Sequence, residues 1–369
     1  MFIYVMLQVS FIGAVNWSAI SVKPGDWVDL LSSTLSSGPF YEIMATSGIA
    51  ILAGFAVVLL IDAVISPSGT GWIYIGTTAR TLYGLAADGH LPNSFLKLNR
   101  YRVPSWATIA ALVLGLLFLL PFPTWYAITT FVTTTTVFTY IISGPALMTL
   151  RKTAPNANRP IKLPAASIIG AIATIAAFLI VYWSTFYYLW FAIALILAGL
   201  PLFFMYTMVN RYGASKPATV ASSIVYWVVL ILTTYFLIYL PFAAPTGWPS
   251  SSPVTMLKLK PIHIIDFVAY VIVMAALTIG LTLYVASTAK DRENAMKHVR
   301  AGWWVVATIF SALVLSFLGS FSVFETPIIP FPWDTVIAAL AALVLYLYGS
   351  YSGILTEDLV VALREMGGV

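Results

Sequence analysis

Long runs of apolar residues recur along the whole chain, separated by short polar loops. Ten of these runs are about 16 to 25 residues long, enough for a helix to cross about 30 Å of hydrocarbon at about 1.5 Å per residue. None of them alternates apolar and polar positions as the strands of a membrane barrel do. The pattern predicts an all-α integral membrane protein with about ten transmembrane helices, over residues 1–16, 45–66, 106–122, 125–149, 164–184, 188–209, 220–241, 264–286, 301–321 and 331–352.

The composition supports this class and excludes several others. Of the 369 residues, 60% are hydrophobic and only 8% are charged, which is typical of neither a soluble domain nor a disordered chain. The chain has no cysteine, so disulfides, cysteine-bound metals and thiol catalysis are excluded. The net charge of +5 indicates nucleic acid binding only if the basic residues form a patch.

The basic residues are instead distributed over alternate loops, which predicts membrane topology rather than a nucleic-acid partner. Short loops rich in Lys and Arg stay on the cytoplasmic side of a membrane. One set of loops carries only Lys23, Lys258 and Lys260. The distribution predicts a multi-pass protein of the cell membrane, with cytoplasmic loops near 77–105, 150–163 and 288–300 and a cytoplasmic C-terminus. The basic residues of this larger set are Arg80, Lys97, Arg100, Arg102, Arg151, Lys152, Arg159, Lys162, Arg211, Lys216, Lys290, Arg292, Lys297, Arg300 and Arg364.

Two of the predicted cytoplasmic loops carry spaced residues that hydrophobicity does not require. Residues 77–92 read TTARTLYGLAADGHLP, and residues 150–164 read LRKTAPNANRPIKLP. The first resembles the cytoplasmic end of helix eight in the amino acid–polyamine–organocation permease superfamily, Ser-Arg-x-x-Tyr-Ala-Met-Ala-Arg-Asp-Gly-x-Leu-Pro, with Ala79 and Ala87 in place of the usual Ser and second Arg. The second resembles the linker between the family's helices ten and eleven. The residues that match these two motifs are Arg80, Tyr83, Asp88, Gly89 and Pro92 in the first, and Arg151, Pro155, Arg159 and Pro160 in the second.

The resemblance implies part of a leucine-transporter-like fold, which is built from inverted repeats. On this basis, residues 1–209 correspond to the family's helices seven to twelve, and residues 210–369 add four transmembrane helices and a cytoplasmic tail. The chain is then expected to begin inside a helix and to lack the N-terminal helices. Helices one and six, which hold the substrate's carboxylate and amine in that fold, would be among the missing ones.

The resemblance also implies a function. It suggests the C-terminal portion of a secondary active permease that moves amino acids or related amines, with the missing N-terminal helices as a possible partner. Coupling to H⁺ or Na⁺ is expected, without any other cofactor or metal. The alternative is a non-transporting membrane scaffold or partner subunit derived from a permease. An enzyme is not expected, because the chain has no His-Glu-x-x-His motif and no phosphate-binding loop with a lysine.

The predicted second span and its continuation supply the first candidates for an ion or substrate path. Asp62 is the only carboxylate well inside an apolar run, and intramembrane carboxylates are commonly functional. It is interpreted either as a proton-coupling site or as a hydrogen-bonded structural acid. Ser66, Ser68 and Thr70 follow around Pro67, where a kink or an unwound turn is expected. Their oxygens suit a sodium ion, or simply bond back to the helix.

A threonine-rich span supplies further candidates. Thr129, Thr133 and Thr136 recur at spacings of four and three, so they share one face of a helix between residues 125 and 149. This face is interpreted either as the lining of a polar vestibule or as a helix-packing surface. Arg80 and Asp88 belong either to an inner-gate charge network or to a solvated cytoplasmic cap.

Overall fold

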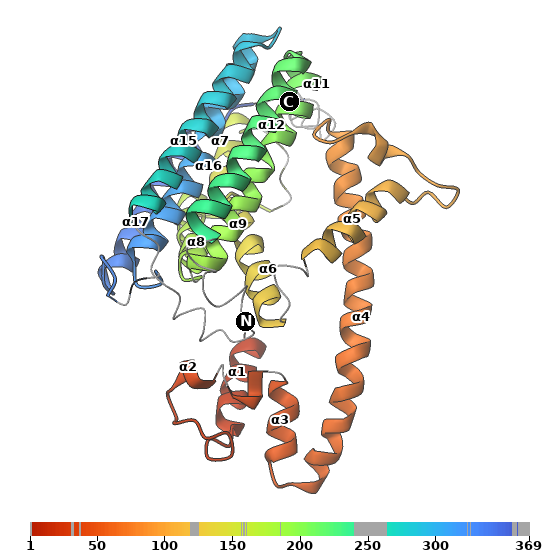
Figure 1. The fold of residues 1–369 in the computed structure, drawn as a ribbon, viewed down its shortest axis with the longest axis vertical. Helices are drawn as coiled ribbons and strands as arrows, with labels where there is room; N and C mark the ends of the chain where they lie inside the picture. Colours follow the sequence, from red (N-terminus) through yellow and green to blue (C-terminus); the bar gives the residue numbers. More distant parts are fainter. Residues whose placement is uncertain are drawn as a thin grey trace. The chain divides into compact units, whose positions relative to one another are not determined.

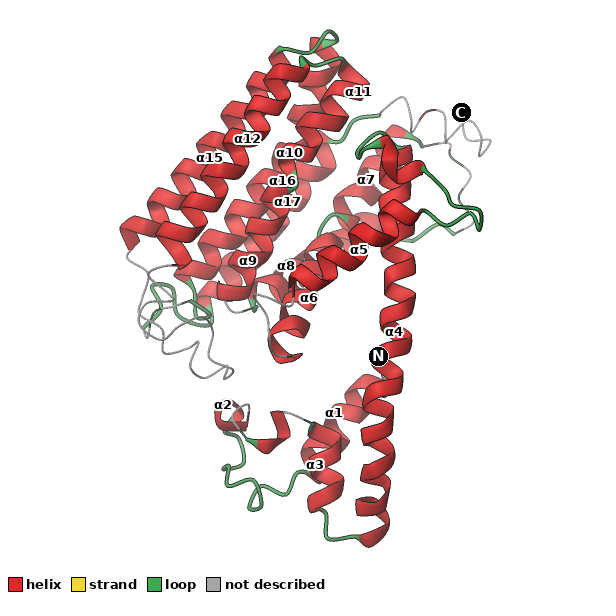
Figure 2. Ribbon diagram, turned by 45° about the vertical axis from the view of Figure 1, so that its right-hand side comes forward, coloured by secondary structure: helices red, strands yellow, loops and turns green. Residues whose placement is uncertain are grey.

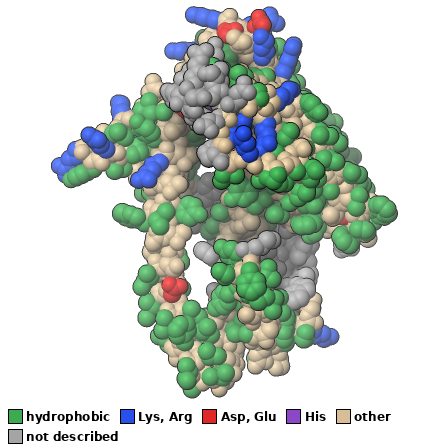
Figure 3. All heavy atoms as spheres, turned by 180° about the vertical axis from the view of Figure 1, so that it is seen from behind, with side chains coloured by type: hydrophobic (Ala, Val, Ile, Leu, Met, Phe, Trp, Pro, Cys, Tyr) green, Lys and Arg blue, Asp and Glu red, His purple; other side chains and the backbone are tan. Residues whose placement is uncertain are grey.

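The computed structural model describes residues 2–118, 125–239 and 264–355 together with Val360, apart from positions 31, 32, 37, 156, 158, 160, 185, 323 and 325. Within this part of the chain all regular structure is helical, as Figure 2 shows. The predicted all-α membrane class is confirmed. On the face seen in Figure 3, apolar side chains cover the flanks of the helices, where a bilayer would contact them.

Seven stretches of helix in the described residues are long and apolar enough to cross a membrane. They are residues 50–87, 128–153, 186–212, 216–237, 264–287, 292–318 and 333–352. Three shorter apolar helices cover residues 2–14, 105–117 and 166–182. Each of the ten predicted spans thus coincides with one of these helices, although the exact limits differ.

The helices divide into two packed units, each of which is described by itself. The first holds the described residues up to Ala87 and those from Asn93 to Ala127. Its longest element, α4, has 38 residues and measures about 57 Å at about 1.5 Å per residue, well beyond the thickness of a bilayer. The elements of this unit are α1 (Phe2–Ala14), α2 (Trp27–Leu30), η1 (Thr34–Ser36), α3 (Pro39–Thr46), α4 (Ala50–Ala87), η2 (Asn93–Leu96) and α5 (Ser105–Phe118).

The second predicted span was therefore placed too short, because α4 continues past Pro67 without an unwound turn. Proline removes one backbone donor from the helix, and the hydroxyls that follow it bond back to carbonyls one turn earlier in the same helix. The Ser68 hydroxyl donates to the carbonyl of Val64 at 2.5 Å, and that of Thr70 donates to the carbonyl of Ser66 at 3.0 Å. The serines and threonines that suggested a break thus accompany an intact helix.

The second unit contains residues 88–92 and the described residues from Ile128 onward. The long helices α12, α15 and α16 run side by side in it (Figure 1). The predicted division between residues 209 and 210 lies within this unit and remains a prediction about the family pattern. Its elements are α6 (Trp125–Tyr140), α7 (Ser143–Thr153), α8 (Ala166–Tyr182), α9 (Phe186–Ala198), α10 (Leu200–Leu202), η3 (Phe203–Met208), α11 (Val209–Tyr212), α12 (Lys216–Thr233), η4 (Thr234–Tyr239), α15 (Ile264–Ser287), α16 (Arg292–Leu318) and α17 (Trp333–Ser352).

Aromatic side chains pack together near the ends of three helices of this unit. Phe267 of α15 stacks on Phe317 of α16 with ring centroids 3.7 Å apart, and Phe186 of α9 meets both at 5.5–5.7 Å. Such ring pairs stabilise a packed interior beyond their buried area, by about 0.5–1.5 kcal/mol each. They hold three helices together at one level of the unit.

The helix that begins at α9 is interrupted near Pro201 and continues through the π-helical turn η3. Such irregularities leave backbone carbonyls without helical donors. Two side chains of α12 supply donors: Trp227 Nε1 bonds to the carbonyl of Ala198 at 2.9 Å, and the Ser223 hydroxyl bonds to that of Pro201 at 3.2 Å. The irregular backbone is thereby satisfied by the neighbouring helix, as a membrane requires.

Small residues allow α7 and α8 to pack closely. Gly144, at the start of α7, lies so near α8 that an added Cβ would come within 2.4 Å of the Gly170 carbonyl oxygen and closer still to the Thr174 hydroxyl. Glycine at such contacts lets helix backbones approach in membranes. A two-residue turn, residues 141–142, separates α6 from α7 just before Gly144.

We predict that Gly144→Ala lowers the thermal stability of the purified protein, because the new methyl group must push α7 and α8 apart. Overpacking of this kind costs about 1–3 kcal/mol. The matched control is Gly280→Ala in α15, where an added Cβ meets nothing within 4 Å. Thermal unfolding in detergent measures both. Equal unfolding temperatures for the two variants would contradict the close packing of α7 on α8.

Candidate functional site

The polar residues of α4 form a stripe along one side of the helix. At about 100° per residue, Ser66 lies about 40° and Thr70 about 80° from Asp62, so the three share a face. Ser68 lies about 120° away in the other direction and does not belong to it. Because α4 is continuous, it brings together only Asp62, Ser66 and Thr70 of the predicted path residues. Ser68 lies apart from them.

This stripe is turned away from the neighbouring helix. Ile75 and Ala79 line the contact with α5, and they lie about half a turn around α4 from Ser66 and Thr70. Asp62, Ser66 and Thr70 are all exposed in the chain by itself. A carboxyl group that faces lipid at mid-membrane costs about 2.5–3.5 kcal/mol even on the lower scales. The stripe therefore requires water or further protein beside it.

The threonine-rich helix α6 has a packed side and an open side. Phe131, Thr134 and Phe138 are buried, and the Thr134 hydroxyl donates to Ser184 Oγ at 3.0 Å. Thr133 and Thr136 are exposed and Thr129 is half-buried. The predicted face of Thr129, Thr133 and Thr136 is thus partly exposed, and its role, as a vestibule lining or as a packing surface, remains a prediction.

The first motif loop is attached to the end of α11. Gly89 has a φ of +78°, a left-handed conformation that favours glycine, and its carbonyl accepts from Asn210 Nδ2 at 3.1 Å. The carbonyl of Asp88 accepts from the Arg211 guanidinium at 3.0 Å, and His90 Nδ1 lies 2.8 Å from Thr207 Oγ1. Sequence spacing gave no indication of these partners, which lie more than a hundred residues away. These bonds give the loop a structural role, and its part in an inner gate remains a prediction.

The second motif loop caps a helix. The Arg159 guanidinium donates to the carbonyls of Leu150, Ala154, Pro155 and Ala157 at 2.6–3.3 Å, around the end of α7. A cation at a helix C-terminus satisfies carbonyls that have no helical donors and interacts well with the helix dipole. Arg159 of this motif therefore stabilises the C-terminal end of α7.

Three other predicted motif residues lie around these loops. Arg151 Nη2 closes the second loop by donating to the carbonyl of Leu163 at 2.8 Å. Pro92, the last residue of the first motif, is half-buried. Tyr83 of α4 lines the space between α4 and α5. Pro160 lies outside the described residues.

A buried carboxyl group that the sequence pattern did not single out lies at the start of α17. Asp334 is only 2% exposed. Its Oδ2 accepts from the Tyr182 hydroxyl of α8 at 2.7 Å and from the Ser320 backbone N–H at 3.0 Å. Its Oδ1 accepts from the N–H of Thr335. Asp334 therefore joins α8, α17 and the loop after α16, which is a structural rather than a catalytic arrangement.

A metal site is not formed by the described residues, among which no three His, Cys, Asp or Glu side chains lie close enough to share an ion. What these residues offer is a polar helix face in the first unit and an exposed threonine face in the second. Hydroxyl and carboxyl oxygens at a membrane-crossing helix suit a small cation or a hydrated solute.

Comparison with known proteins identifies the class. The family model for amino acid permeases matches residues 1–193, just over half of the chain. The chain belongs to the amino acid permease family, and its predicted resemblance to the amino acid–polyamine–organocation superfamily is confirmed. The family consists of transporters, in agreement with the helical membrane fold.

Two individual relatives match over nearly the whole chain, and a third matches over about a third of it. A glutamate/serine transporter of Bacillus subtilis (strain 168) is 26% identical over 358 residues, which cover 97% of this chain and 50% of that protein. An aspartate-proton symporter of the same organism is 25% identical over 363 residues, covering 95% and 51%. A general amino acid permease of Saccharomyces cerevisiae (strain ATCC 204508 / S288c) is 32% identical over 124 residues, covering 32% and 20%.

The chain thus spans about half the length of the first two relatives. The similarity to them continues beyond residue 193, so the helices after α9 also belong to a pattern that these transporters share. No solved structure matches the chain at a significant level.

We predict that Asp334→Asn destabilises the protein because it removes a charge-assisted acceptor from a buried site. Hydrogen bonds to charged groups contribute about 1.5–3 kcal/mol each. Asp266→Asn is the matched control, since Asp266 also lies in the first turn of its helix, α15, but is only half-buried. Thermal unfolding of Asp334→Asn, Tyr182→Phe and the double variant measures the coupling. Additive effects of the two changes would contradict a direct bond between them.

Proposed function

We propose that this chain forms half of a secondary active transporter for amino acids, driven by an ion gradient. The observation that carries the proposal is the match, over at least 95% of the chain, to two amino acid transporters of about twice the aligned length. In this proposal residues 1–209 supply the family's helices seven to twelve. A further segment of protein then supplies the helices that bind the substrate's carboxylate and amine.

The exposed surface of α4 supports a partner of this kind. Between Ile61 and Tyr74 every residue of α4 is exposed, on all sides of the helix. Lipid can cover the apolar sides, but it cannot solvate the stripe that contains Asp62, Ser66 and Thr70. Substrate-binding helices, with a hydrated path between them and α4, would meet this requirement. We place the coupling ion or the solute along this stripe.

The names of the relatives suggest the substrate class and the ion. One is described as a glutamate/serine transporter and another as an aspartate-proton symporter. We therefore propose small or acidic amino acids as substrates and a proton as the coupling ion, with sodium as the second candidate. We further propose that the C-terminus and the two motif loops face the cytoplasm, because the basic residues concentrate in those loops.

Uptake by the native cell tests this function. Deleting the coding region and then restoring it should abolish and recover uptake of labelled serine, glutamate or aspartate. A protonophore should collapse the restored uptake, while replacement of sodium by potassium should leave it unchanged. Unaltered uptake of all three amino acids, with the protein present in the membrane, would contradict the proposal and favour a non-transporting scaffold subunit.

A change at Asp62 tests the site. We predict that Asp62→Asn reduces ion-driven uptake at least about tenfold, equivalent to about 1.4 kcal/mol of lost interaction, while membrane insertion is unchanged. Asp29→Asn, which makes the same chemical change on the short helix α2, is the control. Uptake by Asp62→Asn at the wild-type rate would remove this carboxyl group from the mechanism.

Two serines sharpen the same test. Ser66 lies on the face of Asp62, and Ser68 lies about 120° away from it. Ser66→Ala should lower uptake, whereas Ser68→Ala should leave it unchanged, because the Ser68 hydroxyl only bonds to the carbonyl of Val64. Equal effects of the two changes would argue against a functional stripe on α4.

A further inference from the structure

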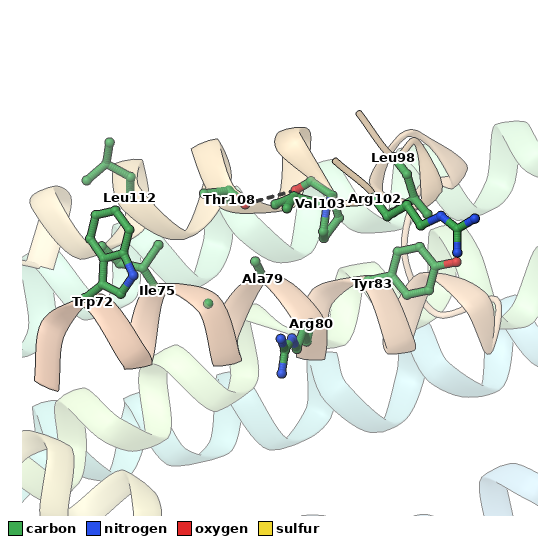
Figure 4. A pocket seen from close by; sticks show the side chains of 12 residues that line it. Trp72, Ile75, Ala79, Arg80, Tyr83, Leu98, Arg102, Val103, Thr108 and Leu112 are labelled. Carbon is green, nitrogen blue, oxygen red and sulfur yellow. Dashed lines mark hydrogen bonds between the residues drawn. The ribbon is translucent and has the colours of Figure 1, made fainter. Parts of the chain in front are cut away.

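The first unit contains a cleft between α4 and α5 that the proposed transport path does not use. It has a volume of about 710 Å³ and is formed by α4, α5 and the loop between them. Its lining changes from apolar to basic along its length, as Figure 4 shows. Trp72, Ile75 and Leu112 lie at one end, and Tyr83 and Arg102 lie at the other.

The basic end is built by a hydrogen-bonded turn. Asn99 Oδ1 accepts from the N–H groups of Tyr101 and Val103 at 2.9 and 3.0 Å, and the Asn99 carbonyl accepts from the N–H of Arg102 at 2.9 Å. The turn holds Arg102 at a φ of +59°, in the left-handed region where glycine is favoured. The turn thereby fixes the backbone of Arg102 in a conformation that residues other than glycine seldom adopt.

This turn directs Arg102 into the cleft. In Figure 4 the guanidinium of Arg102 and the hydroxyl of Tyr83 point toward one another across the basic end. Arg80 also borders the cleft, but its side chain extends on the side of α4 away from α5 in this view. No acidic side chain is among the described residues that line the cleft. Its charge therefore suits an anion.

The apolar end suits a hydrocarbon chain. Trp72 is 82% exposed and Leu112 is 49% exposed, on helices whose sides are apolar. Aliphatic side chains at one end, and Tyr83 with Arg102 at the other, match the depth profile of a membrane from hydrocarbon to headgroup. A phospholipid carries an anionic headgroup and apolar acyl chains in this same order. A protein partner would need an anionic group and an apolar segment at a matching spacing.

We propose that this cleft binds a membrane phospholipid with an anionic headgroup. The Arg102 guanidinium and the Tyr83 hydroxyl donate to the phosphate oxygens, a role for which arginine's planar fork of donors is well suited. One acyl chain lies along Ile75 and Leu112 beside the Trp72 ring. The site is independent of the polar stripe of α4, which lies on the other side of that helix.

Lipid retention by the complete protein tests this proposal. The protein is exchanged into vesicles of phosphatidylcholine alone or of equal parts of phosphatidylcholine and phosphatidylglycerol, extracted in mild detergent, and analysed by native mass spectrometry. Thermal unfolding is measured with each lipid and with inorganic phosphate. The expected result is retention of phosphatidylglycerol, and a higher unfolding temperature with this lipid than with phosphatidylcholine or phosphate.

Three variants locate the site. Arg102→Gln should weaken phosphatidylglycerol retention at least about tenfold, equivalent to about 1.4 kcal/mol. Arg100→Gln is the matched control, because Arg100 lies in the same turn but over the Tyr101 ring, 4.6 Å from its centroid, and does not line the cleft. Leu112→Trp should reduce retention by filling the apolar end while every charge is kept.

Several results would overturn the proposal. Equal stabilisation by inorganic phosphate would indicate a free-anion site, and equal retention of phosphatidylcholine would indicate an apolar groove without headgroup selection. Equal losses in Arg102→Gln and Arg100→Gln would place the lipid elsewhere. If Arg102→Gln fails to fold, unchanged retention by Leu112→Trp is sufficient to reject the site.

Discussion

Hydrocarbon cannot hydrogen-bond, and this constraint determines how the polar groups of the chain are arranged. Every polar group on a membrane-spanning helix needs a partner within the protein or within water that the protein encloses. The break near Pro201 is stabilised by Trp227 and Ser223 of a neighbouring helix, and Asp334 is surrounded by three donors. At these two points the second unit satisfies an irregular backbone and a buried charge internally. The carboxyl group of Asp62 on α4, by contrast, is exposed.

Close packing of the second unit depends on small residues at defined contacts. Gly349 of α17 lies where an added Cβ would come within 2.9 Å of both Trp304 and Pro145, so α7, α16 and α17 meet there. Gly144 plays the same part between α7 and α8. By contrast, Gly69 and Gly71 of α4 have nothing within 4 Å of an added Cβ. Glycine thus serves close helix contacts in one unit, and in α4 it stands on an open surface.

The helical class and the ten apolar stretches were predictable from the sequence, because length and hydropathy determine which segments can cross a bilayer. The limits of α4 were not. Ser66, Pro67 and Ser68 lower the hydropathy and predict a kink or an unwound turn, whereas α4 continues through them and nearby hydroxyls bond back to the helix. The resemblance of the two loops to a family was also readable, since both motifs have characteristic spacing. Their actual partners, such as Asn210 for Gly89, depend on tertiary packing and leave no local signal.

The candidate site was only partly predictable, for a related reason. Asp62 was conspicuous because apolar residues flank it on both sides, whereas Asp334 stands near the end of a predicted span, where an acid is ordinary. Yet Asp334 is the one that the chain buries and satisfies, while Asp62 is left exposed. The flanking residues in the sequence indicate how unfavourable a charge is at a given position in a membrane. Only the structure shows which groups stabilise that charge. Where a chain supplies these groups internally, the acid stabilises the fold; where it does not, as at Asp62, water or protein beyond these packed helices must solvate the carboxyl group.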